Sequence, residues 1–176
     1  MEDQVRQSIM IALIALLALA MAAPTVLAQG NGGAPSDFSQ EADIPAQDPN
    51  APNTDLASLG CDFPLHVAIT GKSKTIELPD GRGIVTAPGQ YVTVTNLATG
   101  ESVRYNITGL TFSSAPDENG IAYFVITGRN LAFDPNGTFL NIGRFTFALD
   151  TNNQDHPIFA PQQGKGQAID VCKVLS

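Results

Sequence analysis

Two long strand-like runs joined by a four-residue turn constrain the fold of this chain more than any other feature. The runs are residues 121–133 and 138–149, and the turn between them reads Asp134-Pro135-Asn136-Gly137. Proline presets the backbone of the second turn position, and glycine takes the left-handed conformation that lets two strands resume pairing. The pattern therefore predicts a β-hairpin with Pro135 and Asn136 at its tip.

This register collects apolar side chains on one face of the hairpin. It sets Phe124 opposite Phe147 and Ile126 opposite Phe145. A slip of one residue would mix the two faces, which is costly where one face is buried. We expect these four side chains to line a ligand cavity if the domain is hollow.

Glycines within the long runs bear on the fold class. Residues 102–114, 121–133 and 138–149 each contain one, namely Gly109, Gly128 and Gly143, and the register sets the last two opposite each other. Paired glycines in mid-strand mark a bulge or a sharp coil. Long strands coiled in this way favour a single antiparallel β-barrel of about eight strands. A β-sandwich whose strands cross between sheets is the alternative.

The chain begins with a segment typical of export. Residues 9–23 form an unbroken apolar run that follows Arg6 and precedes a small-residue tripeptide ending at Ala28. This layout predicts a signal peptide over residues 1–28, cleaved before Gln29, and a secreted protein. An uncleaved anchor is the alternative, and it would be the chain's one contact with a membrane.

Residues 29–60 differ in composition from everything that follows. They carry five acidic residues and no lysine or arginine, and they are rich in proline. Few large apolar residues and one-sided charge leave too little burial to offset the entropy of ordering. We expect a disordered acidic tether here, followed by a β-domain over residues 61–176. That domain, with ten acids and eight bases, lacks the basic surface that nucleic-acid binding requires.

Cys61 and Cys172 are the only cysteines. In an exported chain two cysteines predict one disulfide. A metal site is not expected, because two thiols and two distant histidines provide no ligand pair at a suitable short spacing. No cofactor motif is present.

Few side chains suggest chemistry. His66 falls on the polar side of a predicted strand, where a plain surface residue is the commoner interpretation. His156 stands beside Asp155, a pairing that could orient a general base but is too common to be specific. Arg104 and Arg144 lie near the glycines of their strands; an inward guanidinium would call for an anionic partner, whereas alternation places Arg144 on the face opposite the phenylalanines.

Six short motifs resemble one group of proteins. The motifs are Cys61-Asp62-Phe63-Pro64, Thr70-Gly71-Lys72, Thr95-Asn96-Leu97-Ala98-Thr99-Gly100, Asn106-Ile107-Thr108-Gly109, Thr127-Gly128-Arg129-Asn130 and Asp170-Val171-Cys172. They resemble the uncharacterised small secreted β-domain proteins of filamentous actinobacteria, over residues 61–176. The resemblance implies an exported bacterial β-domain and carries over no functional residue.

These observations lead to one functional hypothesis and two alternatives. No catalytic motif is present, and the strands are coiled, so we expect a non-enzymatic extracellular module that binds a small apolar ligand or a surface partner of unknown identity. One alternative is a hydrolase or isomerase with His66 or His156 as general base at the barrel mouth. The other is a purely structural cell-surface domain.

Overall fold

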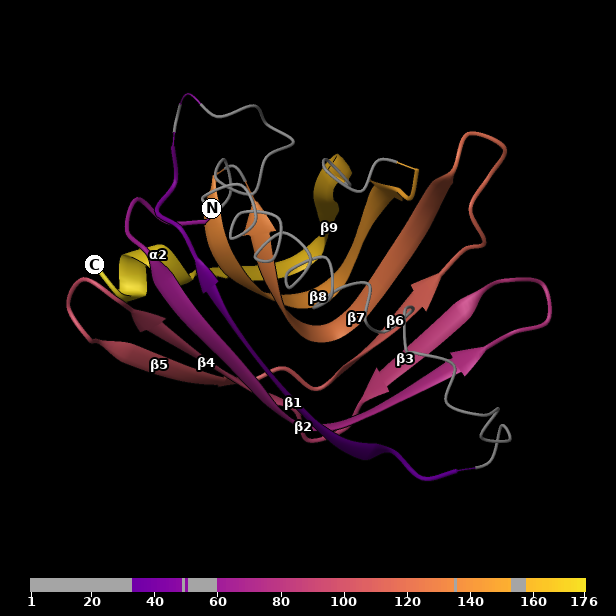
Figure 1. Ribbon diagram of the computed structural model, residues 1–176, viewed down its shortest axis with the longest axis horizontal. Helices are drawn as coiled ribbons and strands as arrows, with labels where there is room; N and C mark the ends of the chain where they lie inside the picture. The colour runs from indigo at the N-terminus through magenta and orange to yellow at the C-terminus, as the bar shows by residue number, and fades with distance from the viewer. Residues whose placement is uncertain (1–32, 49, 51–59, 135, 153–157) are drawn as a thin grey trace, which may run out of the picture.

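The computed structural model describes residues 33–48, 50, 60–134, 136–152 and 158–176, and in this part the protein is an all-β domain (Figure 1). Within these residues, nine strands form one antiparallel sheet, followed by a four-residue helix. The elements are β1 (Ser36–Ile44), β2 (Leu65–Glu77), β3 (Gly83–Ala87), β4 (Tyr91–Asn96), β5 (Ser102–Asn106), β6 (Gly109–Ser113), β7 (Ile121–Asp134), β8 (Gly137–Asp150), β9 (Ile158–Asp170) and α2 (Val171–Val174). The leader predicted for residues 1–28 lies outside the described residues.

The sheet is open. Its strand order is β5-β4-β2-β3-β6-β7-β8-β9, with β1 paired to β2. Strand β2 belongs to two parts of the sheet, because its first residues pair with β4 and its last with β3. The end strands β5 and β9 are not joined to each other. The expected barrel is therefore wrong: the strands coil as predicted, but coiling alone does not bring the two edges together.

The β7–β8 hairpin has the predicted register. Phe124 is opposite Phe147, Ile126 is opposite Phe145, and pairing continues to Asp134 and Gly137 at the tip. The sequence alternation therefore correctly fixed which side chains share a face.

A row of four glycines crosses strands β6 to β9. Gly109, Gly128, Gly143 and Gly166 are consecutive cross-strand partners. A Cβ atom added to Gly128 would lie 2.7 Å from the carbonyl oxygen of Thr108, so the backbones approach too closely for any side chain. Figure 1 shows β7, β8 and β9 bending through a U-shaped curve. We call this row the glycine crease and attribute the bend to it.

The two ends of the curved strands lie in different surroundings. At the hairpin end, β1, β4, β5 and the first part of β2 cover the convex side of β7, β8 and β9, and we call this part the closed half. Its core contains Ala42, Ile44, Cys61, Leu65, Val67, Ile69, Val92, Val94, Ile107, Leu140, Val171 and Leu175. Leu131 and Ile142, on the convex face of the hairpin, pack against it. The other side of the crease, with β3, β6 and the ends of β7 and β8 that lie away from the hairpin turn, is the open half.

Strand β1 lies within the segment expected to be a disordered tether. Ser36–Ile44 pairs with β2 over nine residues. Phe38, Ala42 and Ile44 alternate with acidic residues, and the apolar set packs in the closed core. Alternate burial on an existing strand edge supplies the stabilisation that the isolated segment lacks.

Two other boundaries differ from expectation. Residues 102–114, predicted as one strand, are two strands that pair with β4 and β7 respectively. The start of β9 was also not indicated by the sequence: β9 begins at Ile158 and pairs with β8 across register shifts. Such irregular pairing leaves no simple alternation in the sequence.

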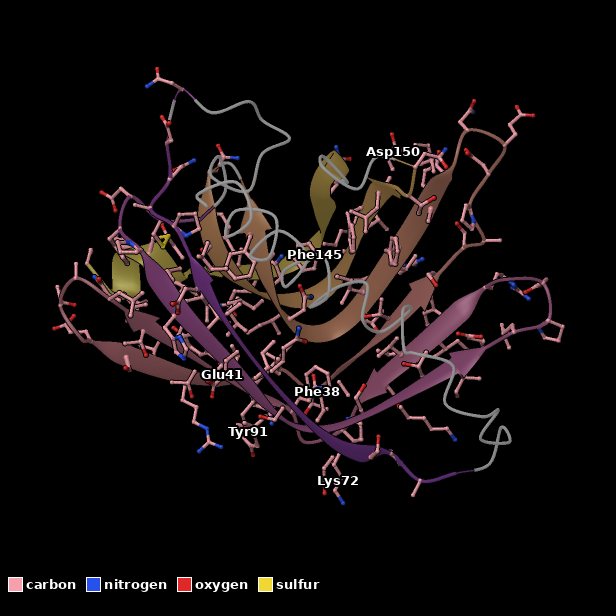
Figure 2. All side chains as sticks on the ribbon, viewed as in Figure 1. Phe38, Glu41, Lys72, Tyr91, Phe145 and Asp150 are labelled. Atoms are coloured by element: carbon pink, nitrogen blue, oxygen red, sulfur yellow. A yellow bond between two sulfur atoms is a disulfide. The ribbon has the colours of Figure 1, made fainter. Side chains whose placement is uncertain are left out.

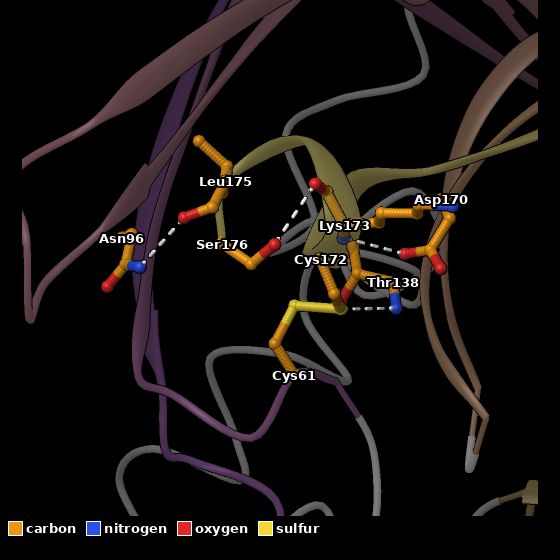
Figure 3. The surroundings of a disulfide bond; sticks show 8 residues. All are labelled: Cys61, Asn96, Thr138, Asp170, Cys172, Lys173, Leu175 and Ser176. Atoms are coloured by element: carbon orange, nitrogen blue, oxygen red, sulfur yellow. Dashed lines mark hydrogen bonds between the residues drawn. A yellow bond between two sulfur atoms is a disulfide. The ribbon is translucent and has the colours of Figure 1, made fainter.

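The predicted disulfide joins Cys61 to Cys172, with 5.4 Å between the Cα atoms (Figure 3). Cys172 lies in α2, which Asp170 caps by accepting a hydrogen bond from the Lys173 amide. Close by, the buried Asn96 donates through its side chain to the Leu175 carbonyl at 3.0 Å. The C-terminal turn is thus held in two ways. The disulfide bonds it to Cys61, just before β2, and a hydrogen bond joins it to Asn96 of β4.

Candidate functional site

The strongest candidate site is a patch of apolar side chains on the concave face of the β7–β8 hairpin. Phe124 and Phe147 stack with ring centroids 4.8 Å apart and planes 9° from parallel. Ile126 and Phe145 form the next cross-strand pair, and both are buried. Figure 2 shows Phe145 on the inner side of the curve. All four residues expected to line a cavity therefore share one face, although the barrel around them is absent.

This concave patch is separate from the core of the closed half. Its cluster consists of Ala122, Phe124, Ile126 and Phe147 with Leu149 packed against them. Within the described part of the chain, every member comes from β7 or β8. A patch built by one hairpin can be covered or uncovered without dismantling the main core.

A polar side chain without a partner lies on the same face. Asn130 follows the crease on β7 and, by strand alternation, shares the face of Phe124 and Ile126. Its side-chain nitrogen and oxygen are both buried and have no hydrogen-bond partner. An unsatisfied amide of this kind calls for a partner, because it loses its hydration without replacement. No sequence signal singled out Asn130.

His66 makes contacts that the sequence did not predict. Its Nδ1 lies 2.7 Å from the Asp43 Oδ1, and its Nε2 lies 4.0 Å from the Glu41 Oε2. Asp43 is directly opposite His66 on β1, on the outward face of the sheet. The carboxylate orients the imidazole, as in a general-base pair. Thr95, the cross-strand neighbour on β4, hydrogen-bonds Ser102, so its hydroxyl is not directed at the ring.

The two arginines face outward. The Arg104 guanidinium lies 4.4 Å from the centre of the Tyr91 ring, an exposed cation–π contact. Arg144 is exposed on β8, on the face predicted for it. Neither supplies an inward anion site.

Two candidates lie outside the described residues, namely Asp155 and His156. Among the residues that are described, no group of three His, Cys, Asp or Glu side chains could hold a metal ion. In the same part of the chain no helix is long and apolar enough to cross a membrane.

Among the described residues, two ionisable groups have shifted pKa values, and neither belongs to the concave patch. Burial against the closed core raises the pKa of Tyr105. Hydrogen bonds from the Arg82 backbone and guanidinium lower the pKa of Asp80, which is fully exposed.

No protein-family model, curated protein or solved structure matches this chain. The geometry of the faces described above is therefore the basis for a functional argument.

Proposed function

We propose that this protein is a secreted, non-enzymatic module that binds a small apolar or amphipathic ligand on the concave face of the β7–β8 hairpin. The observation that supports this is the stacked pair Phe124 and Phe147, which lies apart from the main core. Ile126 and Phe145 form the next cross-strand pair of the hairpin. Stacked aromatic rings with aliphatic neighbours offer a broad apolar surface to an acyl chain or a ring.

Asn130 favours an amphipathic ligand over a purely apolar one. Its buried amide has both a donor and an acceptor without partners. A ligand hydroxyl, amide or protonated carboxyl group could satisfy both, while its apolar part covers Phe145 and Ile126. An apolar ligand would leave the amide unsatisfied at a cost of about 1–3 kcal/mol.

Export and the disulfide are consistent with this role. A bridge between Cys61 and Cys172 is stable in an oxidising compartment. The leader expected at residues 1–28 would direct the chain there. A binding module outside the cytoplasm is thus the simplest reading that uses both features.

The first experiment is mass spectrometry of the protein under native and then denaturing conditions. A ligand retained from the producing cell appears as extra mass in the native spectrum that denaturation releases. Titration with cis-parinaric acid, a fluorescent fatty acid, then measures affinity directly. We expect saturable binding at one site.

Two variants locate that site. Phe147→Ala removes a ring from the concave patch, and we expect affinity to fall roughly tenfold to a hundredfold from the lost apolar contact. Phe38→Ala is the matched control, since it removes a partly buried ring from β1 in the closed core. Equal loss in both variants, or no uptake by the parent protein and no releasable mass, would contradict the proposal and leave a purely structural domain.

In the part of the chain that the structure describes, the enzymatic alternative rests on the pair Asp43 and His66. Both side chains are on the outward face of β1 and β2, whereas the concave patch is built by β7 and β8. Replacing His66 with Ala should therefore leave ligand binding unchanged. Hydrolysis of an ester substrate at a rate that depends on His66 would instead favour a hydrolase.

A further inference from the structure

The convex face of the open half carries a band of apolar side chains across four strands. Cross-strand pairing aligns one residue from each strand, and directly opposite residues point to the same face. The aligned residues are Ile76 on β2, Ile84 on β3, Phe112 on β6 and Val125 on β7. Tyr123, two positions before Val125, extends the band along β7.

This apolar band is accessible. Phe112 is 41% exposed and Tyr123 is 54% exposed, whereas Phe124 between Tyr123 and Val125 is 3% exposed. The band is therefore on the opposite side of the sheet from the concave patch. In the closed half the same convex face packs against the other layer, through Leu131 and Leu140. An exposed apolar band with aromatic residues is typical of an interaction surface.

Cations border the apolar band. The next cross-strand row reads Lys74, Thr86, Leu110, Thr127, Arg144 and Lys165. Arg144 and Lys165 are exposed. Within the described residues, none of the three cations in this row has a carboxylate within 4.0 Å. The row therefore presents uncompensated positive charge, in contrast to the outward acids Asp37, Glu41 and Asp43 of β1.

From this arrangement we infer that the convex face of the open half docks onto the surface of an anionic phospholipid bilayer. The tyrosine and phenylalanine suit the boundary between headgroups and acyl chains, and the cations suit the headgroup phosphates. A second copy of the chain seated on this face would bring the cation rows of both copies together, with no acid in the apolar band to balance them. The inference goes beyond the ligand site, because it uses the opposite face.

Tryptophan fluorescence tests this docking at the face itself. The chain has no tryptophan, so Phe112→Trp in the full chain introduces a single reporter in the apolar band. With vesicles of phosphatidylglycerol mixed with phosphatidylcholine, we expect a blue shift, and quenching when the lipids are brominated. Vesicles of phosphatidylcholine alone should give neither effect. The fluorescence reports only on the surroundings of position 112, so insertion of residues 9–23 into the bilayer would not by itself produce the blue shift.

Tyr91→Trp is the matched control. Tyr91 is 38% exposed on the outward face of β4, and Figure 2 shows it pointing away from the body of the sheet. Its emission should not change with vesicles. If Phe112→Trp disturbs the fold by circular dichroism, Tyr123→Trp reports on the same face.

Charge variants test the second half of the inference. Arg144→Gln with Lys165→Gln, in the Phe112→Trp background, should weaken partitioning about 30-fold, since each cation near an anionic surface contributes about 1 kcal/mol. Lys72→Gln, outside the cation row, should have little effect.

Four results would overturn the inference. They are equal responses to anionic and neutral vesicles, a response from Trp at position 91 as strong as that at 112, no response at either position, and no effect of the double charge variant. A fifth, a concentration-dependent shift of Trp at position 112 without lipid, would assign the face to a second copy.

Discussion

The closed and open halves are built from the same long strands but bury them differently. In the closed half, β7 and β8 are covered on their convex face by a second layer, and a disulfide fastens the C-terminus to the start of β2. In the open half, Phe112 and Tyr123 on that face are exposed. Both halves carry apolar side chains on this face, Leu131 in the closed half and Phe112 in the open half, so apolar sequence alone does not decide what is covered.

This difference indicates that the closed half mainly determines stability and that the open half mainly determines binding. The closed half holds the largest fully buried side chains, such as Leu65 and Val92. The open half has apolar side chains on both faces, with the buried Phe147 on the concave side and the exposed Phe112 on the convex side. We therefore expect substitutions in the closed half to act on unfolding, and substitutions in the open half to act on binding.

The largest effect is expected at the crease that divides the halves. Gly128→Ala places a Cβ within 2.7 Å of the Thr108 carbonyl oxygen at a φ of 95°. We expect a loss of about 3–5 kcal/mol in unfolding free energy, measured by urea denaturation. Gly100→Ala is the control, because it has a φ of 79° and no atom within 4 Å of the added Cβ, and it should cost about 1–2 kcal/mol. Equal costs would show that close packing at the crease is unimportant.

Removing the disulfide tests whether the closed half determines stability. Replacing both Cys61 and Cys172 with Ala opens a loop whose ends are 111 residues apart in sequence. The unfolding free energy should fall by about 2–5 kcal/mol, chiefly because the unfolded chain gains freedom. Thermal and urea denaturation measure the change. Affinity of the folded variant for cis-parinaric acid should stay unchanged, and its loss would show that the halves are not independent.

Asn96→Ala should have an intermediate effect in the closed half. The substitution leaves the Leu175 carbonyl without its buried donor and the Ala98 amide without its acceptor. We expect a loss of about 1–3 kcal/mol by urea denaturation. Asn106→Ala, which removes an exposed turn bond to the Thr108 amide, should cost clearly less. A larger loss for Asn106→Ala than for Asn96→Ala would contradict our inference that the hydrogen bond holding the C-terminal turn contributes to stability.

The smallest effect concerns Asp80 in the β2–β3 turn of the open half. Its pKa is lowered by the Arg82 backbone amide first and by the guanidinium as well. A lowered pKa contributes stability above the unfolded-state pKa, and this is lost as pH falls through the folded-state pKa. Arg82→Ala keeps the backbone bond, so the pKa measured by NMR titration should rise only part of the way to its ordinary value. A full return would make the guanidinium the main cause.

The β7–β8 hairpin and the disulfide could both be predicted from the sequence. Alternation and the turn at residues 134–137 were enough to place Phe124 opposite Phe147 and Gly128 opposite Gly143, because register has a strict period of two. The pair Cys61 and Cys172 followed from there being only two cysteines in a chain predicted to be exported. These features depend on little beyond their own segments.

Features that depend on partners distant in sequence were not predictable. Strand β1 has too few apolar residues to indicate a strand until the edge of β2 is present to receive Phe38 and Ile44. The contact between His66 and Asp43 follows from that pairing. The barrel failed for a similar reason, since closure requires β5 to meet β9 and no local pattern encodes that meeting. Asn130 looked like an ordinary polar residue two positions after the strand glycine Gly128.

The four glycines of the crease are consecutive neighbours across the sheet although they are far apart along the chain. A mutation at one of them cannot be accepted while its neighbour keeps its backbone in place, so the four positions should evolve as a unit. Descendants of a common ancestor could exchange most of their surface and still retain this set. Distant homologues of this chain would then be recognised by the spacing of these four glycines, together with the alternation of apolar and polar residues on either side of each glycine.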